Sequence, residues 1–81
     1  MTAEVNGQYR PPAQVDITPY RSVILQEFHR IFPGFKDINP QIFYVGPNYW
    51  DGYEVKVVVQ TNAGPHVTLW NVGRNYSVSR A

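Results

Sequence analysis

The sequence predicts a small α+β fold, in which one N-terminal amphipathic helix packs on one face of a three- to four-stranded antiparallel β-meander, preceded by an extended arm. Three observations lead to this fold class. Apolar residues recur at three- and four-residue spacing in the first half of the chain and at a spacing of two in the second half. The dipeptides Asp51-Gly52 and Gly73-Arg74 are hairpin signals that divide the second half into strands. The 81 residues have room for a single domain.

Residues 1–17 are expected to form an extended or flexible arm, because they lack helical or strand periodicity. Asn6-Gly7 suits a tight turn, but its flanking segments are too short for an independent hairpin. Pro11-Pro12 favours extended, polyproline-like backbone. Two interpretations of the arm stay open: a partly disordered tail, or a strap that docks on its own domain or on a partner. Residues 18–81 are expected to form the single α+β domain.

The helix is expected to begin at Thr18 and Pro19, because threonine caps free backbone N–H groups and proline suits the first helical position. Pro33-Gly34 ends it, and Phe35 is expected to fold back under the last turn. One side of this helix is an apolar stripe, and polar side chains fall mostly on the other side, as expected for a helix that lies on a sheet. The apolar stripe consists of Ile24, Leu25, Phe28, Ile31 and Phe32.

The second half of the chain is expected to form the meander. A first strand covers residues 41–45 and resumes over 48–50 after the break at Gly46-Pro47; proline places it at a sheet edge. Further strands are predicted over residues 53–60, 66–72 and 75–80, with a turn over 61–65.

The turns predict a register in which Gln60 lies opposite His66 and Val72 lies opposite Asn75. The helix is expected to cover the face that this register makes apolar. The predicted core face carries Val55, Val57, Val59, Val67, Leu69, Tyr76 and Val78.

The same register predicts which side chains occupy the opposite face: Glu54, Lys56, Val58, Thr68, Trp70, Val72, Ser77 and Ser79. Lys56 would lie across from Trp70, within reach of a cation–π contact. Trp70 is either covered by the arm and its neighbours or anchors an interface, since tryptophan is enriched at interaction hot spots. The aromatic residues near the first hairpin either stabilise that hairpin or dock on a partner. The predicted partner-binding residues are Trp70, Val58, Val72, Lys56, Tyr49, Trp50 and Tyr9.

No catalytic residue, metal site, cofactor site or small-molecule substrate site is predicted. The chain has no cysteine, and its two histidines, His29 and His66, are expected on the helix surface and at a turn. The spacings HxH and HExxH, the GxSxG turn and the glycine-rich phosphate loops do not occur. We therefore expect that the protein is not an enzyme.

Composition also bears on location. The longest apolar runs have three residues, so no membrane span and no membrane partner are predicted. The first residues lack the basic and apolar regions of a signal peptide. We expect the protein in the cytoplasm, or within a virion if it is viral.

The preferred function is a small protein-interaction or structural module whose partner is another protein or further copies of itself. A net charge of +1, few charged residues and abundant aromatic residues are typical of phage or viral accessory proteins, virion components and inhibitors. The alternative is a single-stranded nucleic-acid-binding module, because no acidic residue follows Glu54 while several cations accompany a tryptophan. The residues of this alternative are Lys56, Trp70, Arg74 and Arg80.

Overall fold

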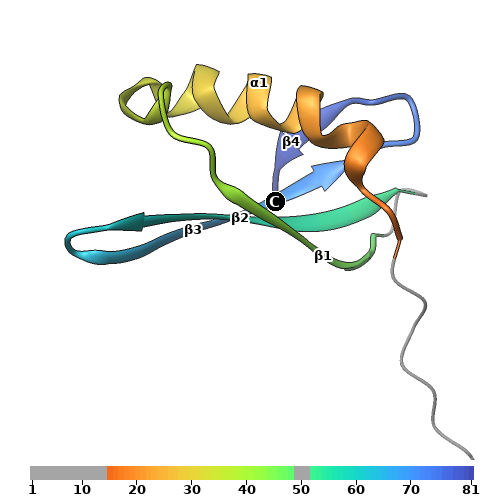
Figure 1. Ribbon diagram of the computed structural model, residues 1–81. Helices are drawn as coiled ribbons and strands as arrows, with labels where there is room; N and C mark the ends of the chain where they lie inside the picture. The colour runs from red at the N-terminus through yellow and green to blue at the C-terminus, as the bar shows by residue number, and fades with distance from the viewer. Residues whose placement is uncertain (1–14, 49–51) are drawn as a thin grey trace, which may run out of the picture.

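The computed structural model describes residues 15–48 and 52–81, so Tyr9, Tyr49, Trp50 and most of the predicted arm lie outside the described residues. Four strands form one antiparallel sheet in the order β1-β2-β3-β4, with β1 at an edge. The predicted α+β class, the meander and the edge position of the first strand are therefore confirmed (Figure 1). The elements are η1 (Thr18–Tyr20), α1 (Arg21–Ile31), η2 (Pro33–Phe35), β1 (Gln41–Pro47), β2 (Tyr53–Thr61), β3 (Gly64–Val72) and β4 (Val78–Arg80).

The entry to the helix differs from the prediction. Thr18 begins the 3-10 turn η1, one turn before α1, and α1 has no side-chain cap. The side-chain oxygen that serves this end of the chain belongs to Asp16, whose Oδ1 accepts a hydrogen bond from the Thr18 N–H at 3.0 Å. Hydrogen bonds from the Thr18 hydroxyl and N–H lower the pKa of Asp16 from its ordinary value. The predicted capping by Thr18 is wrong because the carboxylate two residues earlier takes that role.

The exit from the helix follows the prediction. The Phe32 N–H donates the last helical bond to the Phe28 carbonyl at 2.8 Å, and Pro33 then opens η2. η2 returns Phe35 to the helix, where its ring stacks on Phe28 with centroids 5.9 Å apart and an angle of 6°. Phe35 thereby closes one end of the core.

The β2–β3 hairpin is paired one residue away from the predicted register, because Val59, and not Gln60, lies opposite His66. The Thr61 hydroxyl accepts the Ala63 N–H at 3.1 Å and donates to the Gly64 carbonyl at 2.6 Å. Gly64 has a φ of 109°, a conformation that glycine adopts without steric penalty. These contacts close the hairpin between Thr61 and Gly64, so the turn is shorter than the predicted 61–65.

Pro65 belongs to the predicted turn over residues 61–65, yet it lies in β3. The Ala81 N–H donates to the Leu69 carbonyl at 3.0 Å, so Leu69 directs its backbone groups to the β4 side. In an antiparallel strand the backbone N–H and C=O groups of every second residue point to the same neighbouring strand. The missing N–H of Pro65 would therefore point to the β4 side, as the groups of Leu69 do. β4 reaches only as far as Trp70 along β3, so the missing donor removes no ladder bond among the described strands.

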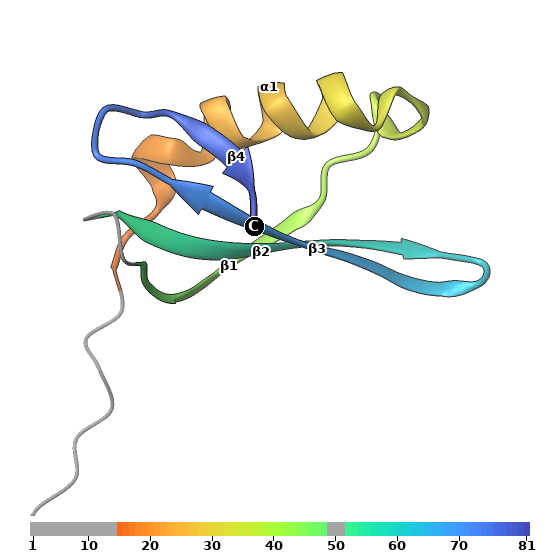
Figure 2. The ribbon, with the colours of Figure 1, turned by 180° about the vertical axis from the view of Figure 1, so that it is seen from behind.

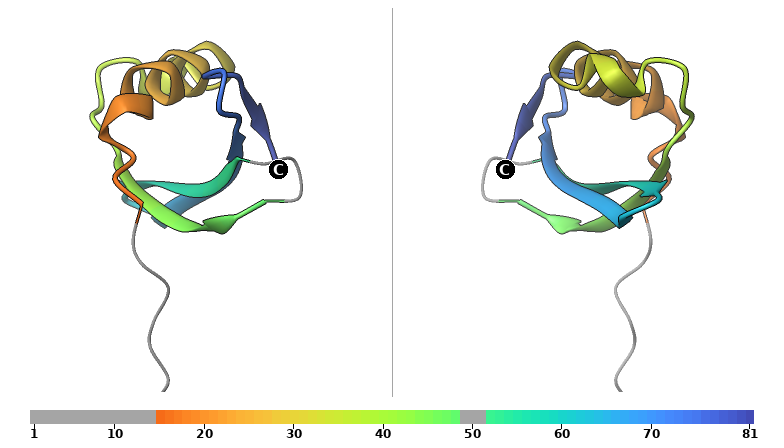
Figure 3. Two further views of the ribbon diagram at one scale, coloured as in Figure 1. Left: turned by 90° about the vertical axis from the view of Figure 1, so that its right-hand side faces the viewer. Right: turned by 90° about the vertical axis from the view of Figure 1, so that its left-hand side faces the viewer.

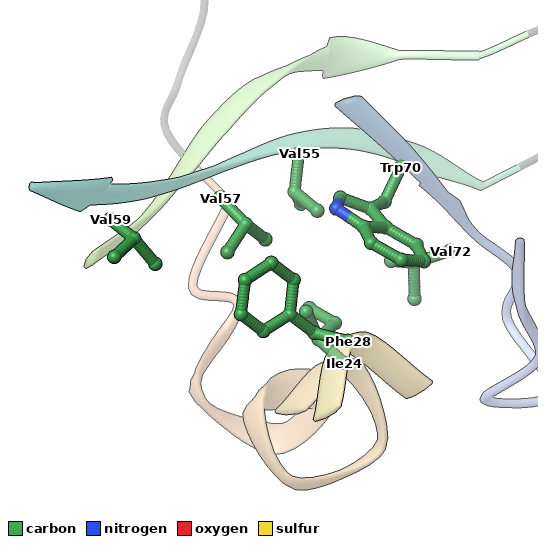
Figure 4. Packing of buried hydrophobic residues seen from close by; sticks show 7 residues of the cluster. All are labelled: Ile24, Phe28, Val55, Val57, Val59, Trp70 and Val72. Atoms are coloured by element: carbon green, nitrogen blue, oxygen red, sulfur yellow. The ribbon is translucent and has the colours of Figure 1, made fainter. Parts of the chain in front are cut away.

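The one-residue difference exchanges the two faces of β3. Trp70 lies opposite Val55 and is 0% exposed, whereas Leu69 is 41% exposed and Val67 is 48% exposed. The Trp70 indole N–H donates to the buried Thr68 hydroxyl at 2.7 Å, and its ring meets the edge of Phe28. The core assignments of Val67 and Leu69, and the opposite-face assignments of Thr68, Trp70 and Val72, are therefore wrong. The buried cluster in Figure 4 consists of Ile24, Phe28, Val55, Val57, Val59, Trp70 and Val72.

The β3–β4 connection is longer than the predicted two-residue turn, because Val72 pairs with Val78 and not with Asn75. The Gly73 N–H donates to the Ser77 carbonyl at 2.8 Å, and the Tyr76 N–H donates to the Gly73 carbonyl at 3.0 Å. A Cβ on Gly73 would lie 2.6 Å from the Ser77 hydroxyl and 2.8 Å from the Asn75 amide oxygen, so both side-chain ends would have to move to admit a larger residue. Val78 packs against the core as predicted.

Tyr76 does not enter the core. It has a φ of 66°, and its side chain is 51% exposed, with its ring 4.9 Å from that of Tyr20. The predicted core position is wrong because Tyr76 lies in the longer turn, and β4 begins to pair with β3 only at Val78.

Figure 3 shows α1 on one side of the curved sheet, which we call the inner face, and no described element on the other side, the outer face. The β2–β3 hairpin extends beyond the partners of its two strands, since β1 pairs only as far as Val58 and β4 only as far as Trp70 (Figures 1 and 2). Within residues 15–48 and 52–81, no helix is both long and apolar enough to cross a membrane.

The register can be tested with two neighbouring residues of β3. Trp70→Ala is expected to lower the free energy of unfolding by about 3–5 kcal/mol, because it empties the largest buried volume of the core. Leu69→Ala is expected to change it by less than about 1 kcal/mol, because that side chain faces solvent. Urea denaturation followed by circular dichroism measures both. A larger loss from Leu69→Ala than from Trp70→Ala would contradict the observed register.

The buried hydrogen bond within β3 allows a second test. Thr68→Val keeps the side-chain shape but leaves the Trp70 indole N–H without its acceptor. The expected loss is about 1–3 kcal/mol in the free energy of unfolding. In a Trp70→Phe background, which has no indole N–H, the same change should cost much less. Equal losses in the two backgrounds would show that the bond contributes nothing.

Candidate protein-interaction surface

The outer face of the sheet carries five apolar side chains on adjacent strands. Cross-strand pairing sets Gln41, Val58 and Val67 in one row. The neighbouring row contains Phe43, Lys56 and Leu69. The residues that we call the outer-face cluster are Phe43, Val45, Val58, Val67 and Leu69.

Burial within the cluster is uneven. Val58, on the central strand, is 9% exposed, whereas the four flanking side chains are 41–50% exposed. Single exposed apolar residues are normal on protein surfaces, but a contiguous group on neighbouring strands is typical of an interaction site. No described element covers this face (Figure 3). The cluster is therefore the strongest candidate surface among the described residues.

Val45 lies on the outer face at a β-bulge. The ladder shifts between Tyr44 and Gly46, so that Tyr44 lies opposite Val55 while Gly46 lies opposite Glu54. Every second residue of β1 from Gln41 is exposed, and Val45 belongs to this series. Val45 therefore stays on the outer face beside Phe43, and the strand continues through the bulge to Pro47.

Lys56 lies on the outer face as predicted, but its aromatic neighbour is different. Its Nζ lies 5.3 Å from the ring centroid of Phe43, a cation–π distance. The predicted contact with Trp70 is wrong because Leu69 occupies the position across β3. The ammonium group thus lies at the centre of the outer-face cluster, and the lysine stem adds apolar surface there.

The structure separates the predicted partner-binding residues. Trp70 and Val72 belong to the core, Val58 and Lys56 belong to the outer face, and the predicted Val58–Trp70–Val72 patch does not exist. The physical reason is the one-residue register difference, which turns the side chains of β3 to the other face. Tyr9, Tyr49 and Trp50 lie outside the described residues.

The structure brings three residues of the nucleic-acid alternative close together, since Arg80 contacts Trp70 and lines a hollow with Arg74, but it leaves Lys56 on the outer face. Arg80 pairs with Trp70 across β3 and β4, and its Cζ lies 5.4 Å from the Trp70 ring and 5.3 Å from the Phe32 ring. Trp70 has no exposed ring face on which a base could stack. Arg74 lies beside a polar hollow of about 580 Å³ at the β3–β4 turn. The hollow is lined by Asn48, Asn71, Gly73, Arg74, Asn75, Ser77, Ser79 and Arg80.

The two histidines contact backbone and aromatic groups of the fold. The His29 Nε2–H donates to the Ile38 carbonyl at 3.0 Å. His66 lies in β3, not at a turn, with its ring edge-on to Phe32 and Phe35 at 5.0 and 5.1 Å. Its Nδ1 is buried and has no hydrogen-bond partner among the described residues. Within the described ranges, no three acidic, cysteine or histidine side chains come together in a group that could hold a metal ion.

Among the described residues, the other titratable groups with a shifted pKa are on the helix. The Arg30 guanidinium donates two hydrogen bonds to the Glu27 carboxylate at 2.6 and 2.9 Å. This pair lowers the pKa of Glu27 and raises the pKa of Arg30. Both residues lie on α1, on the other side of the sheet from the outer-face cluster.

Sequence reasoning missed Phe43, Val45, Val67 and Leu69 as surface residues. Residues of β3 alternate between two apolar sets, so hydrophobicity alone does not select the buried one. The signal that could have identified the register is Pro65, which is compatible with a strand wherever its missing N–H points to an unpaired edge. A shorter turn would then have placed Trp70 in the core.

The position of Trp70 can be tested by fluorescence. The chain has two tryptophans, so Trp70 is the only one left in a Trp50→Phe variant. Its emission is expected to be blue-shifted, weakly quenched by acrylamide and unchanged by single-stranded oligothymidine at low salt, because the ring is 0% exposed. Free tryptophan amide is the reference for full quenching. Strong quenching by the oligonucleotide would restore the nucleic-acid alternative.

Comparisons with known proteins leave the geometry as the guide to function. No protein-family model matches the chain, and neither the curated proteins nor the solved structures compared with it give a match.

Proposed function

We propose that this protein is a small, non-enzymatic protein-interaction or structural module. In this proposal the N-terminal helix packs on the inner face and serves the core, while the outer face binds a protein. The observation that carries the proposal is the outer-face cluster, in which Phe43, Val67 and Leu69 are 41–48% exposed on adjacent strands. Such contact-only roles are those of phage or viral accessory proteins, virion components and inhibitors.

The distribution of side chains supports this assignment. The inner face supplies the buried cluster that stabilises the monomer, including Trp70 and Phe28. An antiparallel sheet with one solvated face normally alternates apolar and polar residues. β1 and β3 instead present Phe43, Val67 and Leu69 to solvent, which weakens solubility without adding to the core. A partner that covers this face would explain their presence.

The position of the N-terminal segment supports a contribution from the predicted arm. The described chain begins at Val15, and residues 15–17 line a hollow of about 450 Å³ together with Ile42, Phe43 and Tyr44 of β1. Because Phe43 belongs to both this hollow and the outer-face cluster, the arm enters the domain beside the proposed interface. We propose that the arm, with Tyr9, extends the contact made by the outer face.

Site-specific photo-crosslinking in the source cells tests this function. A benzoyl-phenylalanine at position 43 preserves an aromatic side chain on the outer face, and the same residue at position 26 replaces the exposed Gln26 of α1. Irradiation is expected to give adducts with a protein from position 43 and none from position 26. Gel mobility and mass spectrometry identify the adduct.

Two results would contradict the proposal. One is the absence of any protein adduct from position 43. The other is an adduct with nucleic acid alone, which would favour the single-stranded nucleic-acid alternative.

A further inference from the structure

We infer that the outer face binds a second copy of this chain, across a two-fold axis that crosses β2 at Val55. The inference rests on the proposed function, because it names the partner of the same surface. It follows from the placement of the charges on this face, from the two apolar residues of β1, and from the size of the surface.

The charges on the outer face are balanced. Among the described strand residues, Glu54 and Lys56 are the only charged side chains on this face, and both belong to the central part of β2. They are half-buried, of opposite sign, and separated by Val55, whose side chain points into the core. A partner of one charge sign would oppose one of these groups with a like charge, which disfavours association.

A second copy satisfies both charges at once. A two-fold axis in the plane of the interface, perpendicular to β2 and crossing it at Val55, exchanges the positions of Glu54 and Lys56. Each Lys56 then faces the Glu54 of the other copy, and the pair occurs twice because a two-fold interface is isologous. Face-packed sheets lie about 10 Å apart, a gap that a lysine and a glutamate side chain can span together.

The same axis brings apolar side chains into contact. Phe43 pairs with Lys56, whereas Val45 lies in the bulge beside the pair of Gly46 and Glu54. Exchanging the Glu54 and Lys56 positions therefore sets each Phe43 against the Val45 of the other copy. These side chains are 44% and 50% exposed in the monomer, so their contact removes apolar surface from water on both copies.

The size of the face predicts a weak dimer. Around an axis at Val55 the two copies of β2 overlap from Tyr53 to Val57, which with the width of three strands gives a projected area of roughly 250 Å². Stable interfaces bury about 800 Å² of accessible surface on each partner, so this overlap is well below the area of a stable interface. Dissociation constants in the micromolar range are therefore expected, and the experiment must reach high protein concentrations.

Reciprocal charge reversal tests the geometry. Sedimentation of the full chain between about 10 µM and 1 mM is expected to show a monomer–dimer equilibrium. Glu54→Lys places lysines opposite each other, Lys56→Glu places glutamates opposite each other, and each should weaken dimerisation at least about tenfold. An equimolar mixture of the two variants restores both opposite-charge pairs and should recover an affinity within about threefold of the wild type.

Matched controls carry the same charge changes away from the outer face. Asp37→Lys and Lys36→Glu lie in the exposed loop after η2, and each should dimerise like the wild type. Circular dichroism reports whether each variant is folded. Lys56→Gln removes the charge without reversing it, and it should give an intermediate loss even if a reversed variant misfolds.

Three outcomes would overturn the inference: a wild type that stays monomeric throughout the range, single variants that dimerise like the wild type, or a mixture that does not recover. The failure of the dimer is separable from the failure of the proposed function. A monomeric protein that still crosslinks from position 43 to a different protein would refute only the second copy as partner.

Discussion

The Thr61 hydroxyl, which accepts the Ala63 N–H and donates to the Gly64 carbonyl, is the contact on which the rest of the sheet depends. It closes the β2–β3 hairpin at Thr61 and Gly64, and in an antiparallel pair the closing position determines every later cross-strand neighbour. The indole of Trp70 is consequently buried, and the side chains of Val67 and Leu69 are left on the outside. The closing position of this hairpin therefore determines both which β3 side chains enter the core and which lie on the candidate interface.

Trp70 connects the sheet to the other elements. Its indole N–H is satisfied within β3 by Thr68, so burial leaves no unpaired donor. Its ring meets Phe28 of α1 at 6.1 Å, while the Arg80 guanidinium approaches it from β4. Helix, central sheet and last strand thus contact one side chain. A short β4, with only three residues, is stabilised by this aromatic contact in addition to its ladder.

The sequence contained enough information for most elements and for the two faces of β2, but its turn signals led to the wrong face for β3. The period of the apolar residues identified the inward valines of β2 and all of the helix stripe except Leu25, which is not part of the core. The breaker Pro33-Gly34 likewise predicted the return of Phe35 onto Phe28. The face of β3 depends on whether Pro65 belongs to the turn or to the strand. A proline fits the strand at this position because β4 pairs with β3 only as far as Trp70 and needs no donor from Pro65. The β3–β4 turn posed a similar problem. It is closed by the hydrogen bond from the Gly73 N–H to the Ser77 carbonyl, and the Gly73-Arg74 pair indicated a shorter, two-residue turn instead. Val67 and Leu69 were assigned to the wrong face for this reason.

The edges of the sheet are poor templates for further strands. On β1 the bulge at Val45 and the proline at the strand end distort the exposed edge. On β3 the position of Pro65 removes a donor from the only stretch that β4 leaves unpaired, and β4 itself is short. A sheet with an apolar face and edge strands that pair poorly can associate face to face, which buries the apolar surface of both partners. The same edges resist the strand-by-strand addition that leads to fibrils. In the proposed dimer, the prolines at these edges would therefore favour a closed pair over an open-ended polymer.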